Sequence, residues 1–91
     1  MTVQIADLGD WGAVTLAAEY DAEKDVIRVN ARAVARVRST LGEAAADRFV
    51  ACAVAHERFH RAHPDATEAQ AHAFALTETG VDPGAFEAVL R

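Results

Sequence analysis

The residues with the clearest chemistry in this sequence are two histidines and a glutamate in the run His56-Glu57-Arg58-Phe59-His60, which reads H-E-x-x-H. Residues four apart on an α-helix point in directions about 40° apart and lie about 6 Å apart along the axis, so both imidazoles can reach one metal ion. Zinc accepts histidine nitrogens at about 2.0–2.1 Å. Glu57 lies one step round the helix, where it can act as general base on a water that the metal has made acidic. The motif predicts a zinc site with His56 and His60 as ligands.

A catalytic zinc site needs a third protein ligand and keeps one position open. The sequence predicts that the next helix follows after only about four residues, which makes a tight helical hairpin. Positions equally far from such a turn face each other, which places Glu68 near the level of His60 and His72 near the level of His56. We expect Glu68 to be the third ligand. The alternative is His72, as a ligand or as a residue hydrogen-bonded to a ligand.

Breakers and capping residues divide the second part of the chain into helices that position these side chains. Helices are predicted over residues 31–39, 43–62, from 65 or 67 to Gly80, and from Pro83 to the last residue. The residue before a proline avoids the helical region, so the long helix is expected to end at the His63-Pro64 step. His63 shares the stripe of the two motif histidines, but at a helix C-terminus the dipole alone favours a histidine.

The first part of the chain favours strands, because β-branched residues cluster there and alternate with polar ones. Residues 13–20 and 26–30 flank a polar turn and predict a β-hairpin with a longer loop, and Val3 and Ile5 indicate a further strand or packed arm. The fold class is therefore α+β: one domain, residues 1–91, with a short antiparallel hairpin or sheet packed on the motif helix and a helical hairpin. The strand expected to align an extended peptide by backbone hydrogen bonds consists of Val26, Ile27, Arg28, Val29 and Asn30.

Charge and composition exclude several classes of partner. Nine basic and 14 acidic residues give a net charge of −5, which argues against a nucleic-acid or anionic-membrane partner. The longest apolar run, Phe49–Ala55, is far shorter than the ~20 residues that span a bilayer, and no secretory signal is recognisable. We expect a cytoplasmic protein in which the single cysteine, Cys52, is buried.

Alanine is the most frequent apolar residue, and this limits how much apolar surface the core can bury. Of the 91 residues, 22 are alanine, so the core is expected to be thin and built from closely packed helices. A bound metal or a second subunit could supplement such a core, and we expect a monomer or a homodimer.

The motif and its surroundings resemble a minimal zincin of the gluzincin kind, similar to the ImmA/IrrE-like peptidases. Ala55–His60 resembles the active-site helix of that family, and Glu68–Ala75 resembles the segment E-x-x-A-x-x-F-A that supplies its glutamate ligand. Ile27–Asn30 resembles the strand that runs past the active site, and Arg48-Phe49 resembles an upstream Arg-Phe pair. The likeness covers residues 14–76. It implies that His56, His60 and Glu68 hold Zn²⁺ and that Glu57 is the general base.

Two functions from different classes follow from these features. The first is a zinc-dependent metallopeptidase in which Glu57 activates water for attack on a peptide or protein substrate. The alternative is a catalytically inactive, zinc-stabilised binding or regulatory module, which the thin core favours because zinc binding can supply folding free energy. An open fourth zinc position would favour the peptidase, whereas four protein ligands would favour the module.

Overall fold

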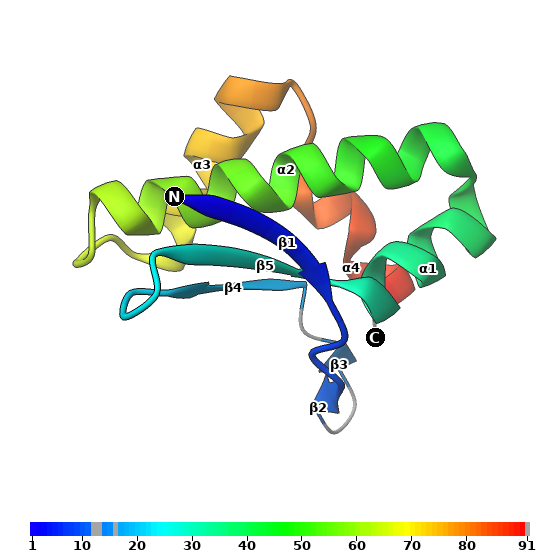
Figure 1. Ribbon diagram of the computed structural model, residues 1–91. Helices are drawn as coiled ribbons and strands as arrows, with labels where there is room; N and C mark the ends of the chain where they lie inside the picture. The colour runs from blue at the N-terminus through cyan, green and yellow to red at the C-terminus, as the bar shows by residue number, and fades with distance from the viewer. Residues whose placement is uncertain (12–13, 16, 91) are drawn as a thin grey trace.

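The computed structural model describes residues 1–11, 14–15 and 17–90, and the side chains of 1–9 and 17–90. The chain is an α+β domain, as the sequence predicts (Figure 1). Its strands are β1 (Thr2–Ala6), β2 (Asp10–Trp11), β3 (Val14–Thr15), β4 (Ala18–Asp21) and β5 (Val26–Asn30). Its helices are α1 (Ala31–Leu41), α2 (Glu43–Ala62), α3 (Glu68–Thr79), the short 3₁₀ helix η1 (Pro83–Phe86) and α4 (Glu87–Leu90).

The main sheet has three strands in the order β1-β5-β4. Strands β4 and β5 form the expected antiparallel hairpin, in which Tyr20 is opposite Ile27. Of the strand predicted over residues 13–20, β4 includes only residues 18–20, and Val14–Thr15 pairs with Asp10–Trp11 instead. Residues 13 and 16 of that prediction lie outside the described residues. Strand β1 joins the other side of β5 in parallel, with Val3 opposite Ile27, so the sheet is mixed. The alternation of Val3 and Ile5 indicates a strand but carries no information about its direction, which is why the parallel pair could not be read from the sequence.

The place of β5 at the centre of the sheet overturns its expected role as the substrate-aligning strand. Its five residues, Val26, Ile27, Arg28, Val29 and Asn30, pair with β1 on one side and β4 on the other. All of them except Arg28 are buried. A strand paired on both edges has no backbone groups left for a peptide. Within the main sheet the edges are β1 and β4.

Local signals explain why the two helices that carry the motif residues begin and end where they do. Helix α2 spans Glu43–Ala62, the range predicted from the sequence, and ends before His63-Pro64. Helix α3 begins at a capping box, in which Thr67 accepts a hydrogen bond from the Gln70 backbone N–H and the Gln70 side chain accepts one from the Thr67 N–H. It ends at Gly80, whose φ of 71° is left-handed. None of these helices, within the described part of the chain, is long and apolar enough to cross a bilayer.

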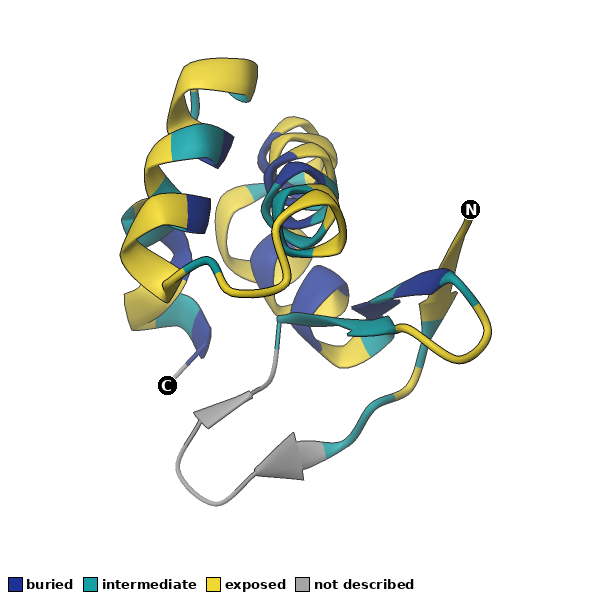
Figure 2. Ribbon diagram, turned by 90° about the vertical axis from the view of Figure 1, so that its left-hand side faces the viewer, coloured by how far each residue is buried: buried dark blue, intermediate teal, exposed yellow. Residues whose placement is uncertain are grey.

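The main core lies where α1, α2 and the C-terminal segment meet the sheet (Figures 1 and 2). Its largest members are Val29, Val34, Val37, Phe49, Phe86 and Leu90. The Phe49 and Phe86 rings pack edge to face with their centroids 5.2 Å apart. Buried alanines fill the rest, which confirms the expected small-residue core. Cys52 is buried in a second, smaller cluster between α2 and α3, as predicted.

Candidate metal centre

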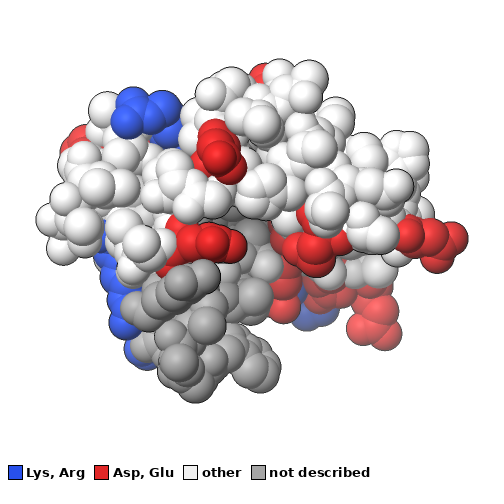
Figure 3. Space-filling model, turned by 180° about the vertical axis from the view of Figure 1, so that it is seen from behind, with Lys and Arg blue, Asp and Glu red and all other residues white. Residues whose placement is uncertain are grey.

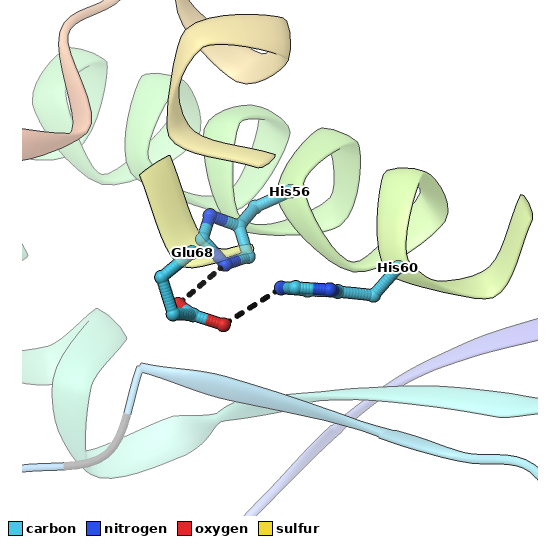
Figure 4. A group of neighbouring side chains, drawn as sticks. All are labelled: His56, His60 and Glu68. Atoms are coloured by element: carbon cyan, nitrogen blue, oxygen red, sulfur yellow. Dashed lines mark hydrogen bonds and ion pairs between the residues drawn. The ribbon is translucent and has the colours of Figure 1, made fainter. Parts of the chain in front are cut away.

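Helices α2 and α3 bring together three side chains that could hold a metal ion: His56, His60 and Glu68 (Figure 4). The histidines project from one face of α2, and Glu68 is the first residue of α3. Glu68 Oε2 lies 3.1 Å from His56 Nε2, and Glu68 Oε1 lies 2.7 Å from His60 Nε2. Candidate ligand atoms of the three residues all lie within 4.8 Å of one another. Glu68, rather than His72, is the third member of this group.

The donor set and its geometry fit a zinc ion. Ligands at about 2.0–2.1 Å from a tetrahedral ion lie about 3.4 Å from one another. The His56–Glu68 contact of 3.1 Å is near this spacing, and the His60–Glu68 contact of 2.7 Å is shorter. His60 Nε2 is buried and makes no hydrogen bond. The 2.7 Å contact between His60 Nε2 and Glu68 Oε1 does not have the angles of a hydrogen bond. A bound cation would be the partner that this buried nitrogen lacks.

The group opens toward solvent on one side. The Glu68 side chain is 81% exposed, whereas the side chains of His56 and His60 are 19% and 20% exposed. Burial is the main reason why the pKa of His56 is lowered, and it outweighs the opposing effect of the Glu68 carboxylate. A lowered pKa keeps the imidazole neutral, which is the form that binds metals. The partly buried histidines and the exposed carboxylate leave access for a further ligand from solvent.

Glu57 lies in the same pocket as His56 and Glu68 but is not part of the possible ligand group. Burial raises its pKa to about 7 against the lowering effect of His60, and the carboxylates of Glu68 and Glu19 raise it further. A carboxyl group with this pKa exchanges its proton near neutral pH. The position and pKa of Glu57 therefore fit the general-base role predicted from the motif.

His72 and His63 do not join the group. His72 Nε2 lies 3.2 Å from Asp82 Oδ1, so its partner is a carboxylate near the C-terminal segment rather than one of the candidate ligands. The His63 ring packs on Phe59, with centroids 4.6 Å apart, and is exposed. The alternative in which His72 is a ligand, or is hydrogen-bonded to one, does not fit these contacts.

A network around Asp25, which the sequence did not reveal, fixes the end of α2 to the sheet. Arg61 donates to both carboxylate oxygens of Asp25 over 2.7 and 3.2 Å, and the Tyr20 hydroxyl donates to Asp25 over 2.7 Å. Arg61 directly follows His60, so this network holds the last turn of α2 against the β4–β5 turn. Asp25 has a φ of 53°, which aspartate tolerates better than most residues. The only signal in the sequence is an aspartate at the end of the polar turn, residues 21–25.

The Asp25 network predicts a pH-dependent contribution to stability. Hydrogen bonds from Arg61, and then from Tyr20, hold the pKa of Asp25 well below its usual range. The stabilisation is therefore present above the ordinary aspartate pKa of about 4 and is lost as the pH falls toward the lower value in the folded state. Asp25→Asn should lower the melting temperature at pH 7 and make a smaller difference at pH 3. Asp65→Asn, at an exposed carboxyl, is the control; an equal effect of Asp25→Asn at both pH values would contradict this assignment.

Two members of the candidate group, His56 and Glu68, line a pocket of about 480 Å³ between α2, α3, the start of β4 and the C-terminal segment. The pocket is lined by Ala17, Ala18, Phe49, Cys52, Ala53, His56, Glu57, Glu68, His72, Pro83, Phe86, Glu87 and Leu90. A larger hollow of about 720 Å³ lies around the α2–α3 turn, but none of the motif side chains with metal or proton chemistry lines it. On the face seen from behind the view of Figure 1, Asp and Glu side chains lie near the centre and along the right-hand side, and Lys and Arg lie mainly on the left (Figure 3).

Comparisons with protein-family models, with curated proteins and with solved structures found no match to this chain. The likeness to small gluzincins therefore remains a prediction from the residues that carry it. Any function for the chain has to be argued from the geometry of the pocket.

Proposed function

We propose that the chain is a zinc-dependent peptidase whose metal ligands are His56, His60 and Glu68. The observation that carries this proposal is the convergence of the three side chains beside a pocket that is lined by His56, Glu68 and Glu57, with burial raising the pKa of Glu57 to about 7. Two imidazoles and a carboxylate are a donor set found in catalytic zinc sites. When bound, zinc would polarise a peptide carbonyl and increase the acidity of water.

Glu57 has the central role among the residues of the chain. It accepts a proton from the water that adds to the carbonyl carbon. As the C–N bond breaks, Glu57 returns this proton to the departing amine, so that one water is consumed for each peptide bond. Burial raises the pKa of Glu57 to about 7, so the carboxylate can accept a proton and release it again near neutral pH.

Strand β4 replaces β5 as the element proposed to align the substrate. It is an edge strand of the main sheet, and Ala17 and Ala18 at its beginning line the pocket with His56 and Glu57. A peptide in extended conformation can add to such an edge by backbone hydrogen bonds, which do not depend on its sequence.

The partner of His72 favours this proposal over a zinc-stabilised module. In a closed structural site, the fourth ligand would come from the protein. His72 is the one further histidine among the described residues of the pocket lining, and it is paired with Asp82. This pairing favours a fourth position that is open to water or substrate. With Cys52 as its lone thiol, the chain needs no oxidising compartment, and we place the activity in the cytoplasm.

Metal-dependent proteolysis is the experiment that tests the proposal. Zinc-loaded protein is incubated with unfolded casein and with a mixed peptide library, and new termini are identified by mass spectrometry. We expect cleavage that stops on chelation and returns when zinc is added. Absence of cleavage by protein that demonstrably binds zinc would contradict the proposal and favour the module.

A further inference from the structure

The pocket continues from the metal group into a part lined by core side chains. We call this part, formed by Phe49, Ala53, Phe86 and Leu90, the apolar chamber. All four side chains are at least 90% buried and belong to the main core cluster. Its walls are therefore set by core packing, which holds side chains in fixed positions.

The C-terminal segment supplies much of the chamber. Pro83 and Phe86 come from η1 and Leu90 comes from α4, and the three face α2 across the pocket. Asp82 fixes the start of this segment, because its carboxylate accepts a hydrogen bond from the Gly84 N–H over 2.9 Å. Phe86 and Leu90 lie outside residues 14–76, the part that resembles the gluzincins, whereas Phe49 and Ala53 lie within it. The C-terminal wall of the chamber is therefore not part of that likeness.

We infer that the apolar chamber receives a large apolar side chain of the substrate, from a residue next to the bond that is cleaved. This inference rests on the proposed peptidase function. The chamber residues line one pocket together with His56 and Glu68, so a peptide whose carbonyl lies at His56 can place a neighbouring side chain in the same pocket. Transfer of that side chain from water to an apolar cavity is favourable in proportion to its area.

The remaining charges of the pocket select against acidic side chains. Glu57, Glu68 and Glu87 line it, and no Lys or Arg does so among the described residues. A substrate carboxylate in the chamber would lose hydration without gaining a cationic partner, which is unfavourable. The chamber therefore selects leucine-like or aromatic side chains over alanine and excludes aspartate and glutamate.

Binding of small amino acid amides tests the inference without hydrolysis. The zinc-loaded Glu57→Gln variant is titrated with N-acetyl-leucinamide, N-acetyl-alaninamide and N-acetyl-glutamic acid amide, and chemical shifts are followed by NMR. Three additional buried carbons correspond to about 50-fold tighter binding of the leucine amide than of the alanine amide. We expect the largest shifts at Phe49, Phe86 and Leu90 and no binding of the glutamate derivative. Equal affinities, or shifts confined to other surfaces, would overturn the inference.

A variant that fills the chamber provides the matched test. Ala53→Leu places a larger side chain in the chamber and should remove the preference for leucine, while leaving zinc content unchanged. Ala51→Leu, at an exposed position on the same helix, is the control and should keep the preference. If Ala53→Leu does not fold, Ala18→Leu narrows the pocket from the strand side. Persistence of the leucine preference in a folded filled variant would overturn the inference.

Cleavage profiles separate this inference from the proposed function. If zinc-loaded wild-type protein cleaves peptides without regard to apolar side chains, the inference is wrong and the peptidase proposal stands. If the protein binds zinc and N-acetyl-leucinamide but cleaves nothing, the peptidase proposal is wrong. The chamber is then a site for an apolar ligand rather than for a substrate side chain, and the inference is overturned in its stated form.

Discussion

Glu57→Gln is expected to lower peptide hydrolysis by about 100- to 10,000-fold, the range typical for loss of general acid–base catalysis. Glutamine has nearly the same shape as glutamate but cannot accept the proton from water. Because Glu57 is not part of the group His56, His60 and Glu68, zinc content and melting temperature in zinc should stay close to those of the wild type. The measurement is the initial rate of cleavage of one peptide identified with the wild-type protein, at equal zinc occupancy.

The same variant also controls for contaminating proteases. A contaminant would be carried through both purifications, so it would give equal rates in the wild type and in Glu57→Gln. If the two proteins cleave at the same rate, Glu57 has no catalytic role and the observed cleavage does not come from this site.

His60→Ala is expected to remove the stabilisation that zinc provides. At a free zinc concentration 100 times the dissociation constant, a ligand that binds only the folded state stabilises it by about 2.7 kcal/mol. For a domain of this size that corresponds to a rise of about 10–20 °C in the melting temperature. The wild type should show this rise and lose it on chelation, whereas His60→Ala should melt at the same temperature with and without zinc.

His63→Ala is the matched control for this prediction. By its spacing, His63 shares the helix face of His56 and His60. Its ring, however, packs on Phe59 at the exposed end of α2, and it is not part of the candidate group. Its removal should leave the zinc-dependent rise intact. A rise of equal size in His60→Ala and in the wild type would show that zinc binds elsewhere.

The helices could be predicted well because their signals are local. The bounds of α2 follow from Gly42 and from the His63-Pro64 step, and the start of α3 follows from the capping box at Thr67. Since the α2–α3 connection is short, the position of Glu68 opposite His60 also follows from sequence distance. The residues of the candidate group were therefore predictable before any coordinates.

What could not be predicted depends on contacts between distant segments. The parallel pairing of β1 with β5 is not encoded in either strand alone, and it is what makes β5 a central strand. Because His72 and His56 are equally far from the turn, the sequence predicts that they lie side by side. In the structure the His72 ring contacts Asp82 of the following loop. The Arg61–Asp25 contact spans 36 positions and carries no motif.

The apolar chamber also depends on contacts between distant segments and could not be predicted from the sequence. Phe49 and Leu90 are ordinary core residues by pattern, and the sequence predicts a short last helix at Pro83 without indicating what it covers. Only the tertiary packing, in which η1 lies against α2 and α4 lies against α1, reveals that these residues line a pocket with His56 and Glu68. Specificity at such a site depends on the shape of the pocket, which is a property of the tertiary structure.

The central claim is that His56, His60 and Glu68 together hold zinc, and the metal content of the purified protein tests it most directly. Elemental analysis of protein prepared without added zinc, and again after zinc addition at neutral pH and removal of excess metal, should give about one zinc per chain, since the described residues contain one group of three candidate ligands. Glu68→Gln, which preserves size but removes the charge, should retain far less. No zinc above background in the wild type, even after zinc addition, would contradict the account.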